Sequence, residues 1–217
     1  MVSEAKANSR KFALIALSVF IVDRAITSLI WVYRKNVPSL RNIPAIPITG
    51  VVFNWLLPII IAYIVEKRDL SSLGLRVGRE KYAVYALYAF VGFVLPAFVV
   101  GLVRGLIVEF VEQFVYIGVA EELFFRGYLM GRFCEWLGER RGLLLNAIVF
   151  GSTHIISGLS QHGLKYPVYD AINGFQTFMG GLLLGYMYLK SGDIVPGTIF
   201  HVSTNAYISR LLQILDA

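Results

Sequence analysis

Charged residues and cysteines are both scarce in this sequence of 217 residues. Asp, Glu, Lys and Arg make up only 16% of the chain, whereas a soluble globular domain carries roughly 25%. Cys134 is the only cysteine, which excludes an internal disulfide and a CxxC metal motif. The chain also lacks a run of Lys and Arg, so its net charge of +6 does not indicate a nucleic-acid partner.

Long apolar segments are what the sequence has in quantity. Hydrophobic residues account for 57% of the chain, and the mean hydropathy is +0.66. About 20 apolar residues cross a membrane as a helix, and a spanning segment must satisfy its own backbone hydrogen bonds. The sequence therefore predicts an all-α fold, a polytopic transmembrane helix bundle of about seven or eight spans in one integral membrane domain, 1–217. The predicted spans are 12–33, 44–66, 82–103, 106–130, 142–159, 171–189 and 193–212.

Basic residues are unevenly distributed among the predicted connections. With the N-terminus inside the cell, the cytoplasmic connections hold twelve Lys and Arg residues and the opposite side holds six. Cytoplasmic loops of membrane proteins are enriched in Lys and Arg. We therefore expect a multi-pass protein with a cytoplasmic N-terminus, surrounded by the lipid bilayer, whose oligomeric state the sequence does not indicate.

Three polar clusters interrupt the apolar segments of the second half of the chain. They are Glu121-Glu122-Leu-Phe-Phe-Arg126, Phe150-Gly-Ser-Thr-His154 and His201-Val-Ser-Thr-Asn205. An ionisable side chain inside a membrane is costly, so it is expected to face a cavity or a partner. Counted from the predicted cytoplasmic ends, Glu121, His154 and His201 lie roughly 17, 20 and 12 Å deep. The sequence thus predicts a mid-membrane cavity to which these helices contribute.

The two adjacent glutamates have different neighbours on a helix. Glu122 and Arg126 are four residues apart and share a face, so they can form an ion pair. That pair is as compatible with a purely structural role as with a functional one. Glu121 lies about 100° round the helix from Glu122 and lacks this partner. A carboxylate placed in that way can serve as a general base.

A further charged pair, Asp23 and Arg24, interrupts the first predicted span. The two residues could form a proton relay, but an ion pair or a snorkelling pair is the more common arrangement. We therefore expect a structural role for them.

The three clusters, in this order on successive apolar segments, resemble the CAAX protease and bacteriocin-processing (CPBP or Abi) family of intramembrane endopeptidases, of the type II CAAX protease kind. The motifs of that family are Glu-Glu-xxx-Arg, Phe-xxx-His, and His-xxx-Asn or His-xxx-Asp, and all three occur here. The resemblance covers about residues 70–210, a stretch expected to form the CPBP-like catalytic core.

The resemblance implies hydrolysis of a peptide bond near the C-terminus of a prenylated (CAAX-type) or other membrane-associated protein. It implies that Glu121 activates water with help from His154, and that His201 and Asn205 stabilise the oxyanion. It also implies that Glu122 and Arg126 orient Glu121. The substrate would be a lipidated or membrane-embedded peptide or protein.

The resemblance favours a mechanism without metal or other cofactors. Zn²⁺ is the alternative, because a carboxylate and two imidazoles can bind it, and Glu121, His154 and His201 would then be the ligands. The sequence contains no HExxH motif of a zinc protease.

Two other functions remain open for the same buried groups. A non-catalytic membrane scaffold or chaperone would retain the fold without the chemistry, although the intact motifs favour an enzyme. A proton-coupled transporter could use Glu121 and the histidines as a relay. The short chain without a repeated half argues against a transporter.

Overall fold

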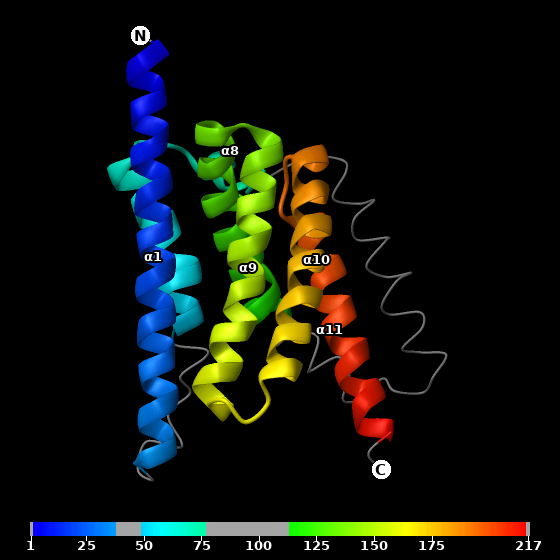
Figure 1. The fold of residues 1–217 in the computed structure, drawn as a ribbon. Helices are drawn as coiled ribbons and strands as arrows, with labels where there is room; N and C mark the ends of the chain where they lie inside the picture. Colours follow the sequence, from blue (N-terminus) through cyan, green and yellow to red (C-terminus); the bar gives the residue numbers. More distant parts are fainter. Residues whose placement is uncertain (1, 38–48, 77–112, 216–217) are drawn as a thin grey trace.

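Helices are the only regular structure in the residues that the computed structural model describes, 2–37, 49–76 and 113–215 (Figure 1). Six helical rods occur in these ranges, so the expected all-α fold is confirmed for this part of the chain. Four rods are the single helices α1 (Val2–Asn36), α9 (Glu139–His162), α10 (Pro167–Ser191) and α11 (Val195–Leu215). The second rod along the chain consists of η2 (Gly50–Leu56), α3 (Leu57–Ile60) and η3 (Ile61–Val65), where η2 and η3 are π-helical. The third rod consists of η6 (Gln113–Gly118), α7 (Val119–Glu121), η7 (Glu122–Met130) and α8 (Gly131–Leu137), where η6 and η7 are π-helical.

Two of the described helices are long and apolar enough to cross a membrane, namely Ala7–Arg34 within α1 and the whole of α9. The second rod is apolar but shorter, over Gly50–Val65. The predicted span 171–189 falls within α10, and the predicted span 193–212 begins two residues before α11 and otherwise falls within it. The predicted span 82–103 lies outside the described residues.

The ends of α10 and α11 follow from local sequence. Pro167 opens α10, where its missing N–H removes no helical hydrogen bond. Gly192 ends α10 with a φ of 65°, a left-handed conformation that favours glycine, and its N–H bonds to the carbonyl of Tyr188 at 2.7 Å. Asp193 then accepts the backbone N–H of Val195 at 3.0 Å, which caps α11. The chain therefore turns back between α10 and α11 within three residues.

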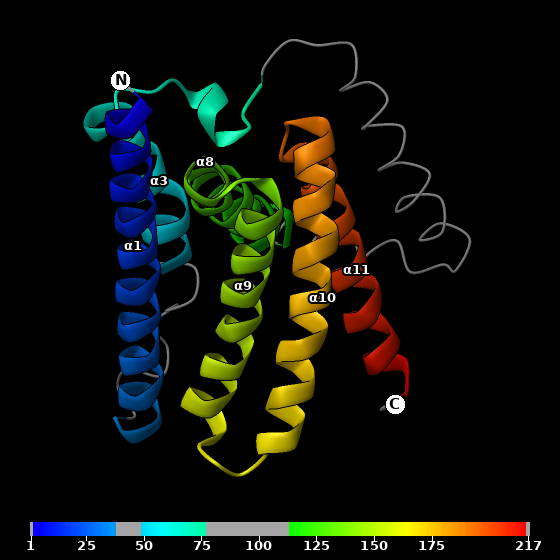
Figure 2. The same cartoon turned by 45° about the horizontal axis from the view of Figure 1, so that its top comes forward.

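Small residues bring α9 and α10 together, and the two helices lie side by side in both orientations of the ribbon (Figures 1 and 2). A Cβ atom at Gly151 would lie 2.7 Å from the carbonyl oxygen of Gly174, so α9 meets the backbone of α10 at this point. Small residues allow helices to pack closely where hydrophobic exclusion from water does not drive association.

Aromatic rings join α1, the third rod and α9 in the centre of the bundle. Phe125 of η7 packs edge-on against Phe20 of α1, with ring centroids 6.2 Å apart, and against Phe150 of α9, at 4.8 Å. The side-chain amide of Asn146 in α9 donates to the carbonyl oxygen of Phe125 at 2.7 Å. All nine residues of η7 are buried, which makes the third rod the core element.

One end of the third rod is covered by the segment that follows the second rod. The buried Arg132 side chain pairs with Glu66 through Nη2 at 2.7 Å and donates to the carbonyl oxygen of Ser72 at 3.2 Å. The carbonyl group of Leu73, in the short 3₁₀ helix η4 (Leu70–Leu73), sits against Gly127, where a Cβ atom would collide with it. These contacts fix the end of the rod that lies nearer the N-terminus of the chain.

Candidate active site

The Glu-Glu-xxx-Arg motif begins at the junction of α7 and the nine-residue π-helix η7. Nη1 of Arg126 lies 3.0 Å from Oε1 of Glu122, and both side chains are at most 1% exposed, so the predicted ion pair is present. The Glu121 side chain is 26% exposed and does not share this pair.

The second motif packs directly on the first. Cζ of Arg126 lies 4.1 Å from the centre of the Phe150 ring, within the range of a cation–π contact. Such a contact contributes about 2 kcal/mol or more when it is shielded from solvent. The Phe150 ring also lies against the rings of His154 and His201, at centroid distances of 6.0 and 6.1 Å. Phe150 therefore helps to fix both histidines and the arginine.

His201 of α11 connects the third motif to both glutamates. Its Nδ1 lies 3.1 Å from Oε1 of Glu122, and its Nε2 lies 3.8 Å from Oε2 of Glu121. Gly197, one turn earlier, allows this approach, because a Cβ atom there would lie 2.9 Å from Oε2 of Glu122. Four motif residues thus form one cluster, namely Glu121, Glu122, Arg126 and His201, of which Glu122 and Arg126 are fully buried.

His154 has a ring orientation that leaves one nitrogen available as a base. The Thr153 hydroxyl donates its only hydrogen to the carbonyl of Phe150 at 2.6 Å. Nδ1 of His154 lies 2.9 Å from the same hydroxyl oxygen and must therefore be the donor in that contact. In the neutral imidazole, Nε2 then carries the lone pair and can accept a proton.

A cavity of about 340 Å³ brings Glu121 and His154 together. Its lining continues along α9 and α10 to His162 and Asp170, next to the turn between these helices. Among the described residues that line it, His201 and Asn205 do not occur. His201 contacts Glu121 directly, as given above, while the role expected for Asn205 stays a prediction.

No group of three or more His, Cys, Asp and Glu side chains is placed to hold a metal ion within the described part of the chain. The alternative Zn²⁺ ligands Glu121, His154 and His201 do not form such a group in this part of the structure, and a mechanism without metal stays a prediction.

Two cavity residues come from helices in which the sequence showed no motif. Arg24 of α1 lines the cavity and pairs with Asp23, as the adjacent charges predicted. Asn54 of η2 also lines it and is buried, and its Oδ1 has no hydrogen-bond partner among the described residues. The only sequence signal for Arg24 was its place in a charged pair inside an apolar segment. Asn54 is an isolated asparagine, for which the sequence contains no signal.

The fold and the site define a helical protein with apolar helices of membrane-spanning length and a buried cluster of carboxylates, histidine and arginine. Residues 104–207, which include all three motifs, match the family model described as "Type II CAAX prenyl endopeptidase Rce1-like". This part of the chain belongs to that family, so the resemblance seen in the motifs is confirmed. Neither a curated protein nor a solved structure gives a significant match to the chain.

Proposed function

We propose that this protein is an intramembrane endopeptidase that hydrolyses a peptide bond near the C-terminus of a prenylated (CAAX-type) or other membrane-associated protein. The observation that carries the proposal is that Glu121 and His154 line one cavity inside a domain of the Rce1-like family. A carboxylate and an imidazole that share a cavity can hold a water molecule between two proton acceptors.

In the proposed reaction, Glu121 takes a proton from water while Nε2 of His154 accepts the second hydrogen bond of that water. The water oxygen then bonds to the carbonyl carbon, and the carbonyl oxygen becomes an oxyanion. Glu121 passes its proton to the amide nitrogen, the C–N bond breaks, and the products are a carboxylic acid and an amine. Both cavity residues thus act on the same water molecule.

The oxyanion would be stabilised from α11. Nδ1 of His201 faces Glu122, and Nε2 is too far from Glu121, at 3.8 Å, for a strong hydrogen bond. In the imidazolium form, the Nε2–H group is therefore available to an oxyanion that forms beside Glu121. Asn205, one turn further along α11, would donate its side-chain amide to the same oxygen.

The decisive experiment measures cleavage of a farnesylated CAAX-type peptide, and of a peptide library, by the purified protein. We expect Glu121→Ala and His154→Ala each to reduce kcat/KM by about 10²–10⁴-fold, the range typical of general acid–base groups. Glu139→Ala is the matched control, because this exposed glutamate at the start of α9 does not line the cavity. Peptidase activity that survives both substitutions would contradict the assignment.

We also propose that hydrolysis needs no metal. Turnover should then be unchanged after treatment with a strong chelator, and metal analysis of the active protein should find no stoichiometric ion. Loss of activity that added Zn²⁺ restores would require a different mechanism.

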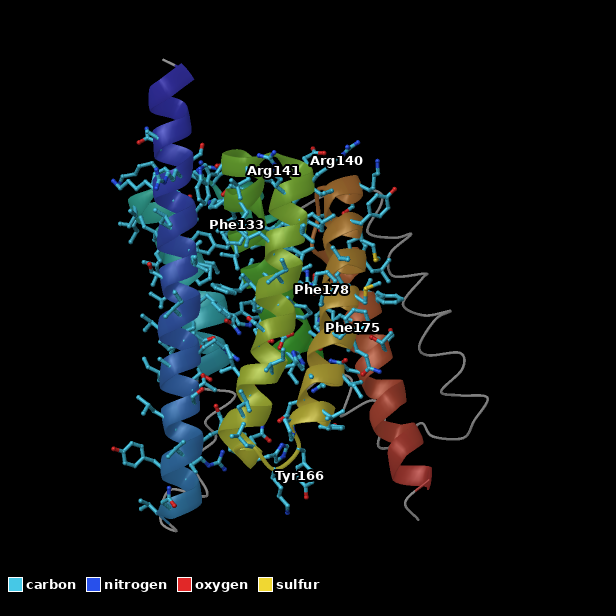
Figure 3. All side chains as sticks on the ribbon, viewed as in Figure 1. Phe133, Arg140, Arg141, Tyr166, Phe175 and Phe178 are labelled. Carbon is cyan, nitrogen blue, oxygen red and sulfur yellow. The ribbon has the colours of Figure 1, made fainter. Side chains whose placement is uncertain are left out.

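We propose a multi-pass arrangement with the N-terminus in the cytoplasm. Arg140 and Arg141 lie at the end of the bundle nearer the N-terminus, and Tyr166 lies at the opposite end (Figure 3). In a Cys134→Ser background, a cysteine at Lys165 should react in intact cells with a maleimide that does not cross membranes. A cysteine at Arg140 should be protected until the cells are opened, and the reverse pattern would invert the topology.

A further inference from the structure

The charged pair in α1 is arranged to hold the arginine at a fixed angle. Nε of Arg24 donates to Oδ2 of Asp23 at 3.0 Å, and Nη2 contacts the same oxygen. The Thr27 hydroxyl donates to Oδ1 of Asp23 at 3.3 Å. Asp23 is 1% exposed, whereas the Arg24 side chain is 19% exposed. The buried carboxylate therefore occupies one edge of a partly accessible guanidinium.

The other edge of the Arg24 guanidinium carries N–H donors that Asp23 does not contact. A guanidinium carries five N–H donors, and Asp23 faces only its Nε and Nη2 side. Within the described part of the chain, no second acceptor contacts Arg24. Arg24 also lines the cavity that Glu121 and His154 share. A ligand in this cavity can therefore reach unoccupied N–H groups of Arg24.

Contacts one helical turn on either side fix the direction in which Arg24 points. Phe20, four residues earlier, packs on Phe125 of the third rod with ring centroids 6.2 Å apart. Ser28, four residues later, has its hydroxyl oxygen 2.8 Å from that of Ser160 in α9. Residues four apart share a helix face. Arg24 therefore faces the groove between the third rod and α9.

Arg24 also lies at nearly the same height as the catalytic groups. Helices α1 and α9 run side by side in the same direction (Figures 1 and 2). At 1.5 Å per residue, Arg24 is about 6 Å above the Ser28–Ser160 contact and His154 is about 9 Å above it. The two side chains thus differ by about 3 Å in height.

Asn54 supplies a second polar group to the same cavity. Its side chain is 7% exposed, it lines the cavity, and its Oδ1 has no hydrogen-bond partner among the described residues. A buried polar atom without a partner is costly unless a ligand or water satisfies it. An amide oxygen accepts hydrogen bonds, and the backbone N–H groups of a peptide are suitable donors.

We propose that Arg24 is a specificity-determining residue that binds the free C-terminal carboxylate of the substrate, while Asn54 accepts a backbone N–H of the same segment. This inference rests on the proposed peptidase function. Arginine binds carboxylates through two parallel N–H groups. Glu121 shares the cavity and would repel a substrate carboxylate, so a nearby cation is needed to hold it.

The experiment compares farnesylated CAAX-type peptides that end in a carboxylate or in an amide, using the full-length purified protein. We expect the wild type to prefer the carboxylate by about tenfold to a hundredfold in kcat/KM, mainly through KM. Arg24→Gln should bring the ratio to about one, mainly by raising KM for the peptide that ends in a carboxylate. Arg10→Gln is the control on the same helix, since Arg10 stacks on Trp136, away from the cavity; it should keep the full preference.

Arg24→Lys is the control for misfolding of the Arg24→Gln variant. Lysine keeps the charge beside Asp23 but loses the planar fork, so this variant should fold and show a reduced preference. An amidated peptide with Glu as its last residue identifies the source of the carboxylate. Cleavage of that peptide as fast as of the acid would overturn recognition of the chain terminus.

The outcomes separate this inference from the proposed function. If the wild type cleaves acid and amide equally, and Glu121→Ala abolishes both activities, only the role of Arg24 is wrong. An unchanged preference in Arg24→Gln leads to the same conclusion. If the wild type cleaves none of the peptides, the peptidase function fails, and the role of Arg24 fails with it.

Discussion

The two N-terminal rods and the motif-bearing helices differ in what their polar side chains contact. In the motif-bearing helices, Glu122 lies against both Arg126 and His201, and the three side chains are at most 11% exposed, so these groups offset one another's charge away from solvent. In the N-terminal rods, Arg24 and Asn54 line the cavity and have hydrogen-bonding groups that no described residue occupies. Side chains that bind one another hold a geometry, whereas side chains with spare donors and acceptors can receive a ligand.

This difference indicates that the two regions of the bundle have different roles. The family match covers residues 104–207 and includes the three motifs, but α1 and the second rod lie outside it. Conservation of chemistry in a family resides in the groups that act on the reacting atoms, while the shape and charge of the remaining cavity wall select the substrate. We therefore expect substitutions in the two regions to have different consequences.

The largest expected effect on stability comes from Glu122→Gln. This change leaves the buried Arg126 guanidinium without a compensating charge, which costs about 3–5 kcal/mol for a buried pair. Glu121→Gln is the matched control, because its partly exposed side chain is not part of that pair and should change stability by less than about 1 kcal/mol. Thermal unfolding in detergent measures the stability of both variants. Equal losses would show that Glu122 contributes no more to stability than Glu121.

A smaller effect is expected where the two regions meet. Ser160→Ala removes the hydroxyl contact between α9 and Ser28 of α1, at 2.8 Å. Interhelical hydrogen bonds in membrane proteins contribute about 0.6 kcal/mol on average. Because the Ser160 hydroxyl also donates to the carbonyl of Ile156, the double variant Ser28→Ala/Ser160→Ala should lose no more than Ser160→Ala alone. Additive losses would mean that the two serines act through other partners.

The smallest effect is expected from Arg68→Gln, which breaks the exposed pair between the segment after the second rod and Glu135 of α8. Exposed pairs contribute about 0–1 kcal/mol and are screened by salt. Any loss should therefore disappear in unfolding measurements at high ionic strength. A loss that persists there would come from contacts that salt screens little, namely those of Arg68 with the buried Glu66 carboxylate, at 3.3 Å, and with the Phe12 ring.

The sequence was sufficient to predict the helical fold and the Glu122–Arg126 pair, because apolar length and a spacing of four residues are local properties. It could not show that His201 meets both glutamates, since that contact joins residues 79 positions apart. The bond from Asn146 of α9 to the carbonyl of Phe125 was also not predictable, because it depends on how two helices pack.

Arg24 shows how a correct prediction can still be incomplete. The expected ion pair with Asp23 is present, and it satisfies the need to neutralise two charges within an apolar helix. Sequence spacing could not indicate that the pair uses only one edge of the guanidinium. That information depends on where α1 packs, which the contacts of Phe20 and Ser28 determine.

The lining of the cavity indicates the route by which a substrate reaches Glu121. It extends from Glu121 towards His162 and Asp170, while the buried Arg132–Glu66 pair occupies the other end of the third rod. Within the described part of the chain, the lining thus forms a continuous path from Glu121 to the end of the bundle that carries the turn between α9 and α10, and this path offers a peptide a route to Glu121.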